Sequence, residues 1–245
     1  MKTIVTLLYG DKYNADDVHR IYHDTKQYRH VCIVDDKNKK YLNKNIETLP
    51  AGEDETFEKI KVFSHDWHGD CIFLDLDLIV QGSLDKVFRK EPTICYCYWK
   101  IKEHVTHGDH KYDSNQVYLK DGNPNAAWMQ RWKGLWNSSV MAWSDNNARY
   151  IYDHFKKHDQ YYMTKYCGDD RFLYHENLFS NVFPRGLIYS WLNGVDSATD
   201  VSPRAYQIKP DYPIVLLNGQ KSKEQLRQEY YDAFSMHKMG QQIQS

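Results

Sequence analysis

The most apolar window of the chain is Cys71-Ile72-Phe73-Leu74-Asp75-Leu76-Asp77-Leu78-Ile79-Val80, and it contains two aspartates. Such a run predicts a buried strand, and residues i and i+2 of a strand project from the same face. Two neighbouring buried carboxylates repel each other and lose hydration, and a divalent cation relieves both costs. The pair therefore predicts a Mn²⁺ or Mg²⁺ site. The alternative is that both aspartates only cap the following turn.

The segments before this window predict a parallel α/β arrangement. Strands are expected at residues 4–8 and 30–34, joined by a helix over about 16–27 that Asp16 or Asp17 caps. A strand, helix, strand succession implies parallel strands with a helical crossover. Further helices are expected at 56–65, 83–88, 145–157, 171–177 and 223–237, and further strands at 93–99, 137–143, 187–192 and 214–217.

Composition narrows the class of protein. The chain has 245 residues, and 32 Lys and Arg nearly balance 33 Asp and Glu, so no global field draws it to nucleic acid or anionic lipid. Aromatic residues make up 15%, which suits sugar rings and bases but also half-buried packing. We find no signal peptide at residues 1–12, no run long enough to span a membrane, and no disulfide framework in five cysteines.

The stretch from Lys100 to Arg131 is polar and aromatic without a clear period. We expect a long loop over one face that can act as a lid. Its histidines fit a solvated loop better than a zinc site; they are His104, His107 and His110. Three tryptophans at helical spacing fit either a buried helix face or stacking on bases or sugars; they are Trp128, Trp132 and Trp136.

Residues 73–84 resemble the DxD segment of GT-A-fold glycosyltransferases, in particular the glycogenin/galactosyltransferase-like group and its small bacterial and phage relatives. Other blocks similar to that family occur in the family's order at residues 6–13, 34–36, 57–63, 137–141, 168–170 and 217–221. The resemblance implies one α/β domain of GT-A type over residues 1–245, with a Rossmann-like mixed sheet flanked by helices. Its nucleotide-binding half would span about 1–100, and an irregular acceptor-side half about 101–245.

The resemblance also implies roles for individual residues. The donor would be bound by Thr6, Leu7, Tyr9, Tyr13, Asp36, Lys59, Leu76, Asn137, Ser138, Gly219 and Lys221. Asp75, Asp77 and Asn218 would hold Mn²⁺ or Mg²⁺. Asp169 and Asp170 would be catalytic, with Asp169 positioning the acceptor hydroxyl or taking its proton. The alternative for Asp169 is a helix cap.

Three positions depart from the family pattern. Asn218 stands where the closing loop usually has a metal-binding histidine, and its amide oxygen is a weaker ligand. In the acidic block, Asp170 replaces a glutamine and Arg171 replaces a second aspartate. An arginine there can hold an anionic group or pair with Asp169.

The resemblance implies metal-dependent transfer of a sugar from a nucleotide-sugar donor, with a UDP-sugar favoured, to an acceptor hydroxyl with retention of configuration. The acceptor could be a glycan, a small molecule or a hydroxymethylated base in phage DNA. We expect a protein of the cytoplasm of a bacterial or phage-infected cell. The alternatives are a catalytically degraded sugar- or nucleotide-binding protein on this scaffold, and a nucleotidyltransferase. The latter usually has a glycine-rich phosphate loop, whereas residues 9–12 contain one glycine.

Overall fold

The structure, a computed structural model, describes residues 1–52, 57–100, 135–166, 168–195, 206–217 and 222–243. The strands are β1 (Lys2–Leu8), β2 (Arg29–Val34), β3 (Glu47–Pro50), β4 (Asp70–Leu74), β5 (Leu78–Val80), β6 (Thr93–Tyr96), β7 (Trp136–Ser144), β8 (Asn181–Val182), β9 (Ile188–Ser190) and β10 (Ile214–Leu216). The α-helices are α1 (Ala15–Asp24), α2 (Asp36–Lys39), α5 (Arg149–Lys157), α6 (Asp159–Lys165), α7 (Asp169–His175) and α8 (Lys223–Ile243). Two 3₁₀ helices are η1 (Glu58–Ser64) and η2 (Tyr98–Lys100).

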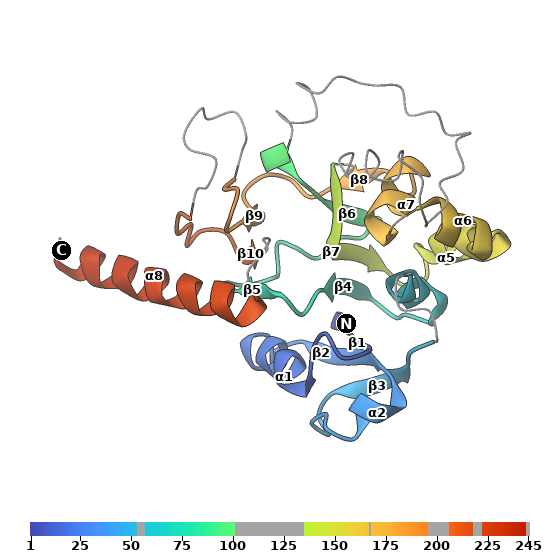
Figure 1. Ribbon diagram of the computed structural model, residues 1–245, viewed down its shortest axis with the longest axis horizontal. Coiled ribbons are helices and arrows are strands. Elements are labelled where there is room, and N and C mark those ends of the chain that lie inside the picture. Colours follow the sequence, from blue (N-terminus) through green and yellow to red (C-terminus); the bar gives the residue numbers. More distant parts are fainter. Residues whose placement is uncertain (53–56, 101–134, 167, 196–205, 218–221, 244–245) are drawn as a thin grey trace.

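The larger sheet has the strand order β3-β2-β1-β4-β7-β6-β8 (Figure 1). Strands β3, β2, β1 and β4 run parallel, whereas β7 runs antiparallel to both β4 and β6. The chain leaves β1 for β2 on one side and later enters β4 on the other, so the strand order reverses at β1. Ligands of open α/β sheets bind outside the carboxyl ends of the strands at such a switch point. The topology therefore points to the loop after β1 and the turn after β4.

The strand register brings the end of β4 and the start of β7 to that edge. Val5 lies opposite Phe73 in the parallel pair β1–β4, and Leu74 lies opposite Val140 in the antiparallel pair β4–β7. The backbone amide of Asp75 extends the second pairing by donating to the Ser139 carbonyl at 2.9 Å. The first residues of β7 are therefore fixed beside the residues that follow β4.

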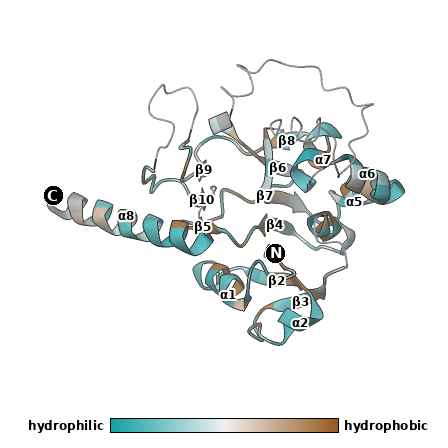
Figure 2. Cartoon of the chain, viewed as in Figure 1, coloured by the Kyte–Doolittle hydropathy of each residue, from teal (hydrophilic) through white to brown (hydrophobic). Residues whose placement is uncertain are grey.

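The two faces of the larger sheet bury separate cores. One face packs Ile4 and Ile72 against Val18 of α1. The opposite face packs Val5 and Phe73 against η1, α5, α6 and α7. In Figure 2 hydrophobic residues gather along the strands, while the visible surfaces of α5 and α8 are mainly hydrophilic. Burial of alternate strand residues on both faces is the main force that holds the sheet between its helices.

A smaller sheet with the order β5-β10-β9 continues directly from the turn after β4. Strand β10 runs antiparallel to β5 and parallel to β9. Helix α8 covers this sheet through Leu226 and Tyr230, and the Tyr230 ring meets Trp191 edge to face with the centroids 5.1 Å apart. The turn after β4 is therefore the point where the chain passes from one sheet to the other.

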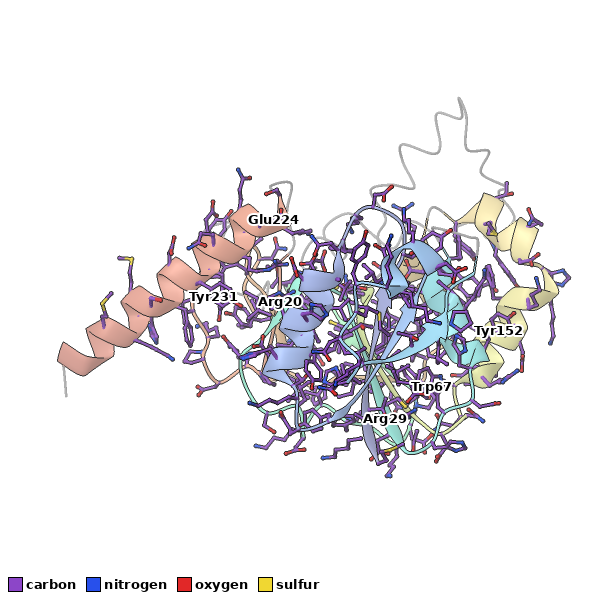
Figure 3. The ribbon with its side chains drawn as sticks, turned by 90° about the horizontal axis from the view of Figure 1, so that it is seen from below. Arg20, Arg29, Trp67, Tyr152, Glu224 and Tyr231 are labelled. Carbon is purple, nitrogen blue, oxygen red and sulfur yellow. The ribbon has the colours of Figure 1, made fainter. Side chains whose placement is uncertain are left out.

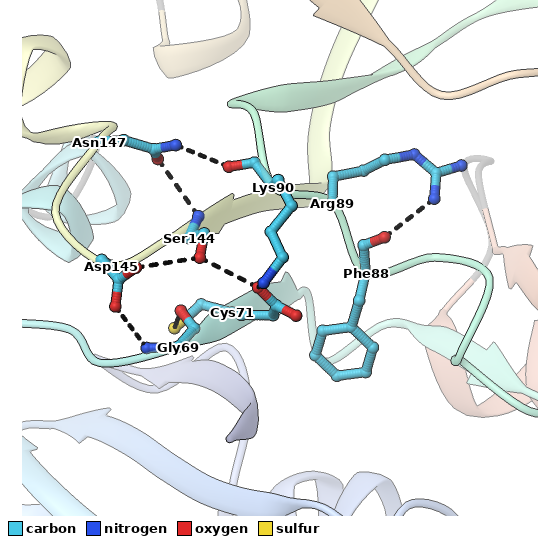
Figure 4. A network of polar contacts seen from close by, with 9 residues as sticks. Gly69, Cys71, Phe88, Arg89, Lys90, Ser144, Asp145 and Asn147 are labelled. Atoms are coloured by element: carbon cyan, nitrogen blue, oxygen red, sulfur yellow. Dashed lines mark hydrogen bonds and ion pairs between the residues drawn. The ribbon is translucent and has the colours of Figure 1, made fainter.

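A network of polar contacts surrounds the amino end of β4 (Figure 4). The Asp70 carboxylate accepts hydrogen bonds from Lys90 Nζ at 2.8 Å and from Ser144 Oγ at 3.0 Å. Asn147 donates to the Lys90 carbonyl at 2.6 Å and accepts from the Ser144 amide at 3.2 Å. The network ties β4, β7 and the segment after β5 together at the edge away from the switch point.

The expected α/β class with a mixed, mostly parallel sheet is confirmed, but several local predictions are wrong. The 71–80 window is two strands, and residues 75–77 lie in the turn between them, so its aspartates do not share one strand face. The window breaks because β4 and β5 belong to different sheets. The expected helix over 56–65 is the 3₁₀ helix η1, residues 83–88 form a turn, and the strand expected to reach residue 99 ends at Tyr96. Strand β3 and helix α6 were not expected.

Two further expectations concern membranes and thiols. No helix in the described ranges is long and apolar enough to cross a membrane. Four buried cysteines are thiols and form no disulfide among the described residues; they are Cys32, Cys71, Cys95 and Cys97. The fifth, Cys167, lies outside the described residues.

Candidate active site

A cavity of about 570 Å³ opens at the switch point, where β1 and β4 end. Its walls are the loop at residues 9–13, the turn at Asp75 and Leu76, Lys59 of η1 and Asp169 of α7. The volume is within the range that holds small-molecule ligands and cofactors. Residues from four separate parts of the chain therefore line one cavity, and most of them carry charged or aromatic side chains.

The loop after β1 is held in place by Asp35 at the end of β2. Gly10 adopts a positive φ of 72°, and its amide donates to Asp35 Oδ2 at 2.9 Å. Asn38 donates to the Gly10 carbonyl at 3.1 Å, while Asp35 also caps α2 by accepting from the Asn38 amide at 3.0 Å. Asp36 is exposed on α2 and does not line the cavity. The neighbouring Asp35, which the sequence analysis did not select, fixes the loop.

Lys59 is the central cation of the site. Its ammonium group contacts both oxygens of Asp75, at 2.9 and 3.0 Å, and donates to Ser138 Oγ at 2.9 Å. Asp169 Oδ2 lies 3.5 Å away. Burial opposes the charge of Lys59, but the carboxylates of Asp169 and Asp75 outweigh it and raise the pKa of the lysine. Lys59 therefore stays protonated, although only 16% of its side chain is exposed.

The two aspartates of the turn sit in different electrostatic environments. Burial raises the pKa of Asp75 to about 6; Lys59 opposes this rise and the charge of Asp77 adds to it. Burial also acts on Asp77, but Lys223 and Lys12 outweigh it and lower the pKa of Asp77. Lys223 Nζ lies 3.2 Å from Asp77 Oδ2, and the Tyr13 hydroxyl donates to the same carboxylate. Each carboxylate thus has its own lysine partner.

The acidic start of α7 faces the same cluster. Asp170 accepts a hydrogen bond from the Ser138 amide at 2.5 Å, and burial together with Asp169 raises its pKa. Asp169 follows Gly168, the N-cap, which makes no side-chain capping bond. Among the described residues, Asp169 Oδ2 has no hydrogen-bond partner, so its contact is the longer ion pair to Lys59. Asp170 is held by the backbone, whereas Asp169 Oδ2 is buried and lies only in ion-pair range of Lys59.

The cluster is rich in carboxylate oxygens. Four carboxylates share three lysines in this cluster; the carboxylates are Asp75, Asp77, Asp169 and Asp170, and the lysines are Lys12, Lys59 and Lys223. Carboxylate oxygens are the ligands that Mg²⁺ and Mn²⁺ prefer, and the surplus of negative charge favours a cation. No group of three or more His, Cys, Asp or Glu side chains is arranged for a metal in the part of the chain that the structure describes. Asn218, the third ligand expected from the sequence, lies outside that part.

Most of the site residues selected from the sequence gather here. Those that line the cavity are Leu7, Tyr9, Tyr13, Lys59, Asp75, Leu76 and Asp169. Ser138 contacts Lys59, Asp77 contacts Tyr13, and Asp170 contacts the Ser138 amide. Thr6 is buried within the sheet, and Asn137 accepts from the Ser139 amide at 3.0 Å. Gly219 and Lys221 lie outside the described residues, as does the stretch 101–131 that we expect to be a lid.

Three charged residues of the site were missed by sequence reasoning. Lys12 and Lys223 surround Asp77, and Arg20 of α1 contacts the backbone of the turn. Lys223 is two residues from Lys221, and nothing in the sequence decides which of the two faces the carboxylate. Arg171 is buried in α7, and its Nη1 finds no hydrogen-bond partner among the described residues.

Comparison with known proteins identifies the fold. The sequence matches no protein-family model and no curated protein. The structure is similar to an active-site mutant of LgtC, with a TM-score of 0.56 and 12% identity over 94% of this chain and 95% of that one. The galactosyltransferase LgtC, in complex with donor and acceptor sugar analogues, gives a TM-score of 0.55 at 12% identity, again covering 94% and 95% of the two chains. The apo form of the glycosyltransferase GlyE of Streptococcus pneumoniae gives 0.53 at 11% identity, covering 94% of this chain and 60% of that one. The chain therefore has the fold of the GT-A glycosyltransferases.

Proposed function

We propose that this protein transfers a sugar from a nucleotide-sugar donor to an acceptor hydroxyl, with Mn²⁺ or Mg²⁺ held by Asp75 and Asp77. The observation that carries the proposal is the acidic turn at the switch point of a GT-A fold, beside a cavity of about 570 Å³. A UDP-sugar is the favoured donor and retention the favoured outcome, both from the family resemblance. We also propose that residues 1–245 form one GT-A domain, with a nucleotide-binding half over about 1–100 and an acceptor-side half over about 101–245.

The charges of the site suit the departure of a nucleoside diphosphate. Negative charge accumulates on the leaving phosphate as the glycosidic bond breaks, and cations that face it lower the barrier. A divalent cation held by Asp75 and Asp77 would act as a Lewis acid on the diphosphate. Lys223 and Lys12 stand on the Asp77 side of the turn and supply fixed positive charge there. Lys59 stands on the other side and holds Asp75 in place.

Asp169 is the carboxylate best placed to act on the sugar or the acceptor. It lines the cavity, contacts Lys59, and has one oxygen without a hydrogen-bond partner among the described residues. A carboxylate in this position can orient an acceptor hydroxyl, take its proton, or stabilise an oxocarbenium-like sugar. All three roles operate chiefly in the transition state. Asp169→Asn should therefore lower kcat by about 100-fold with little change in donor affinity, as steady-state kinetics can measure. A normal kcat would assign Asp169 a structural role.

One observation favours a second candidate, a protein that binds a nucleotide-sugar without turning it over. Each carboxylate of the turn already has a lysine partner, Asp75 in Lys59 and Asp77 in Lys223. A site whose carboxylates have cationic partners of their own can hold a ligand without a metal. In this second candidate, donor binding is independent of Mn²⁺ and no transfer occurs.

The deciding experiment is a donor screen with and without Mn²⁺. Purified protein is given UDP-, GDP- and ADP-sugars, and release of the nucleoside diphosphate is measured alone and with acceptors. The acceptors comprise glycans, small-molecule hydroxyls and DNA that carries hydroxymethylated bases. Mn²⁺-dependent release that is lost in Asp77→Asn supports the proposal. Tight donor binding without release under any condition favours the binding protein. Asp70→Asn is the matched control, because Asp70 lies at the other end of β4.

A further inference from the structure

An arginine of α1 contacts the backbone of the acidic turn at residues 75–77. Arg20 donates from Nη2 to the Leu76 carbonyl at 2.6 Å and from Nη1 to the Leu78 carbonyl at 2.8 Å. These two carbonyls belong to the residues on either side of Asp77. A planar guanidinium that spans both of them restrains the 76–77 peptide group, directly before the aspartate, and the 78–79 peptide group, one residue beyond it. It therefore restrains the direction in which the Asp77 side chain leaves the backbone.

Arg20 is itself fixed by the contact between α1 and α8. Figure 3 shows Arg20 where these two helices approach each other, with Tyr231 of α8 nearby. Arg227 of α8 pairs with Asp17 of α1 at 2.9 Å, and both side chains are largely buried. Asp17 also closes the capping box of α1 with Asn14. The first turn of the helix that carries Arg20 is therefore held both by the Asn14 capping box and by the ion pair with Arg227 of α8.

The charged guanidinium of Arg20 is energetically unfavourable where it lies, which argues against an incidental contact. Burial and the nearby charge of Arg227 both lower its pKa, so its charge is disfavoured where it lies. Its Nε is buried without a hydrogen-bond partner among the described residues. The two carbonyl contacts are the interactions that compensate, and hydrogen bonds from a charged donor are about twice as strong as neutral ones.

We propose that Arg20 is a positioning residue for the cation site: it holds the turn so that the Asp77 carboxylate is presented to the cavity. The proposal rests on the function proposed above, since it assumes that Asp77 binds a metal. It assigns no contact between Arg20 and substrate. Lys223 and Tyr13 contact the Asp77 carboxylate itself, whereas Arg20 acts on the backbone that carries it.

The test uses three variants of the full chain. Arg20→Met removes both carbonyl contacts, and Arg20→Lys keeps the charge but cannot span both carbonyls. Arg29→Met is the matched control, because Arg29 begins β2 and pairs with Glu47, away from the turn. Mn²⁺ affinity is measured by electron paramagnetic resonance without donor, well below each variant's Tm. Hydrogen exchange is measured over a peptide that covers residues 75–81.

Arg20→Met should weaken Mn²⁺ binding by about 10- to 100-fold, the usual cost of losing a residue that orients a metal ligand. Arg20→Lys should lie between it and the wild type. Both should speed exchange in residues 75–81, whereas Arg29→Met should leave affinity and exchange in this peptide near the wild-type values. A loss of thermal stability in Arg20→Met with unchanged Mn²⁺ affinity would overturn the proposal and leave a structural role.

Failure of the proposed function gives a different result. If the wild type binds no Mn²⁺, the metal assignment is wrong. The hydrogen exchange of residues 75–81 then decides whether Arg20 holds the turn. Unchanged exchange in Arg20→Met overturns the inference whatever the affinity for metal, and faster exchange keeps Arg20 as the residue that positions the turn.

Discussion

Strand β4 has an aspartate–lysine pair at each end, and the two pairs have almost the same length. Asp70 and Lys90 are 2.8 Å apart before the strand's buried residues, and Asp75 and Lys59 are 2.9 Å apart after them. Their surroundings differ sharply: 77% of the Lys90 side chain is exposed, against 16% of Lys59. The lysine of one pair therefore lies largely in water and that of the other is enclosed, although the two aspartates are similarly exposed, at 19% and 23%.

The pKa values of the two aspartates express this difference. Burial would raise the pKa of Asp70, but hydrogen bonds from Lys90 and Ser144 outweigh it and lower the pKa. At the other end, burial outweighs the attraction of Lys59 and raises the pKa of Asp75 to about 6. An ion-pair distance alone thus says little about function. A carboxylate that stays poorly neutralised beside a lysine indicates where a further cation or a substrate is to be expected.

The largest difference in activity should be between Asp75→Asn and Asp70→Asn, which remove the carboxylates at the two ends of β4. Asp75→Asn should lower transfer by about 1,000-fold or more, because it removes a proposed metal ligand and frees Lys59. Without metal, its Tm should hold or rise, and stabilisation by Mn²⁺ should disappear. Asp70→Asn should keep full activity and lose no more than about 3 °C in Tm. Full transfer by Asp75→Asn would contradict the metal assignment.

The lysines give the second contrast, in stability. Lys59→Met leaves three buried carboxylates without their shared cation and should destabilise the protein by about 3 kcal/mol. Lys90→Met breaks a pair exposed to water, so its unfolding midpoint should stay close to that of the wild type. Urea unfolding of both variants at pH 7 measures the difference. Equal midpoints for the two variants would mean that the buried pair is no more important than the exposed one.

The contributions of Asp75 and Asp70 to the free energy of unfolding should change with pH in opposite directions. The folded pKa of Asp75, about 6, lies above the unfolded value of about 4, so its contribution is complete below pH 4 and is lost as pH rises through 6. The free energy of unfolding of the wild type should therefore fall relative to Asp75→Asn by about 2 kcal/mol across that range. Asp70 has a lowered pKa, so its contribution should be present above pH 4 and lost as pH falls below it. Parallel pH profiles for wild type and Asp75→Asn would refute the first assignment.

The smallest effect concerns the second lysine of the turn. Lys223 pairs with Asp77 and would compete with a metal for that carboxylate. Lys223→Met should therefore tighten Mn²⁺ binding by about 3-fold in the absence of donor, a fraction of a kcal/mol typical of a partly screened pair. Lys209→Met is the control, because Lys209 is not among the groups that act on Asp77. Weaker Mn²⁺ binding in Lys223→Met would mean that the ammonium group orders the site instead of competing for it.

The sequence predicted the parallel core well because its strands are short, apolar and separated by clear breaks. Strands β1, β2 and β4 and helix α1 follow from local pattern, and the gathering of Lys59, Asp75 and Asp169 follows from family resemblance. The turn at residues 75–77 could not be predicted from hydropathy, because an apolar run does not reveal that it crosses from one sheet to another. The contact of Arg20 with the turn could not be predicted for a related reason, because its partners are backbone atoms of residues 56 and 58 positions away.

The direction of β7 has an evolutionary consequence. Because β7 runs against both β4 and β6, the start of β7 and the end of β6 lie at the same edge of the sheet, where Tyr96 is opposite Trp136. Ser138 of β7 contacts Lys59 there, while pairs such as Ile94 with Met141 fix the register deeper in the sheet. Insertions in the connection between β6 and β7 can be inherited without moving Asp75. The same sheet can thus keep the charged cluster at the end of β4 while the connection between β6 and β7 changes in length.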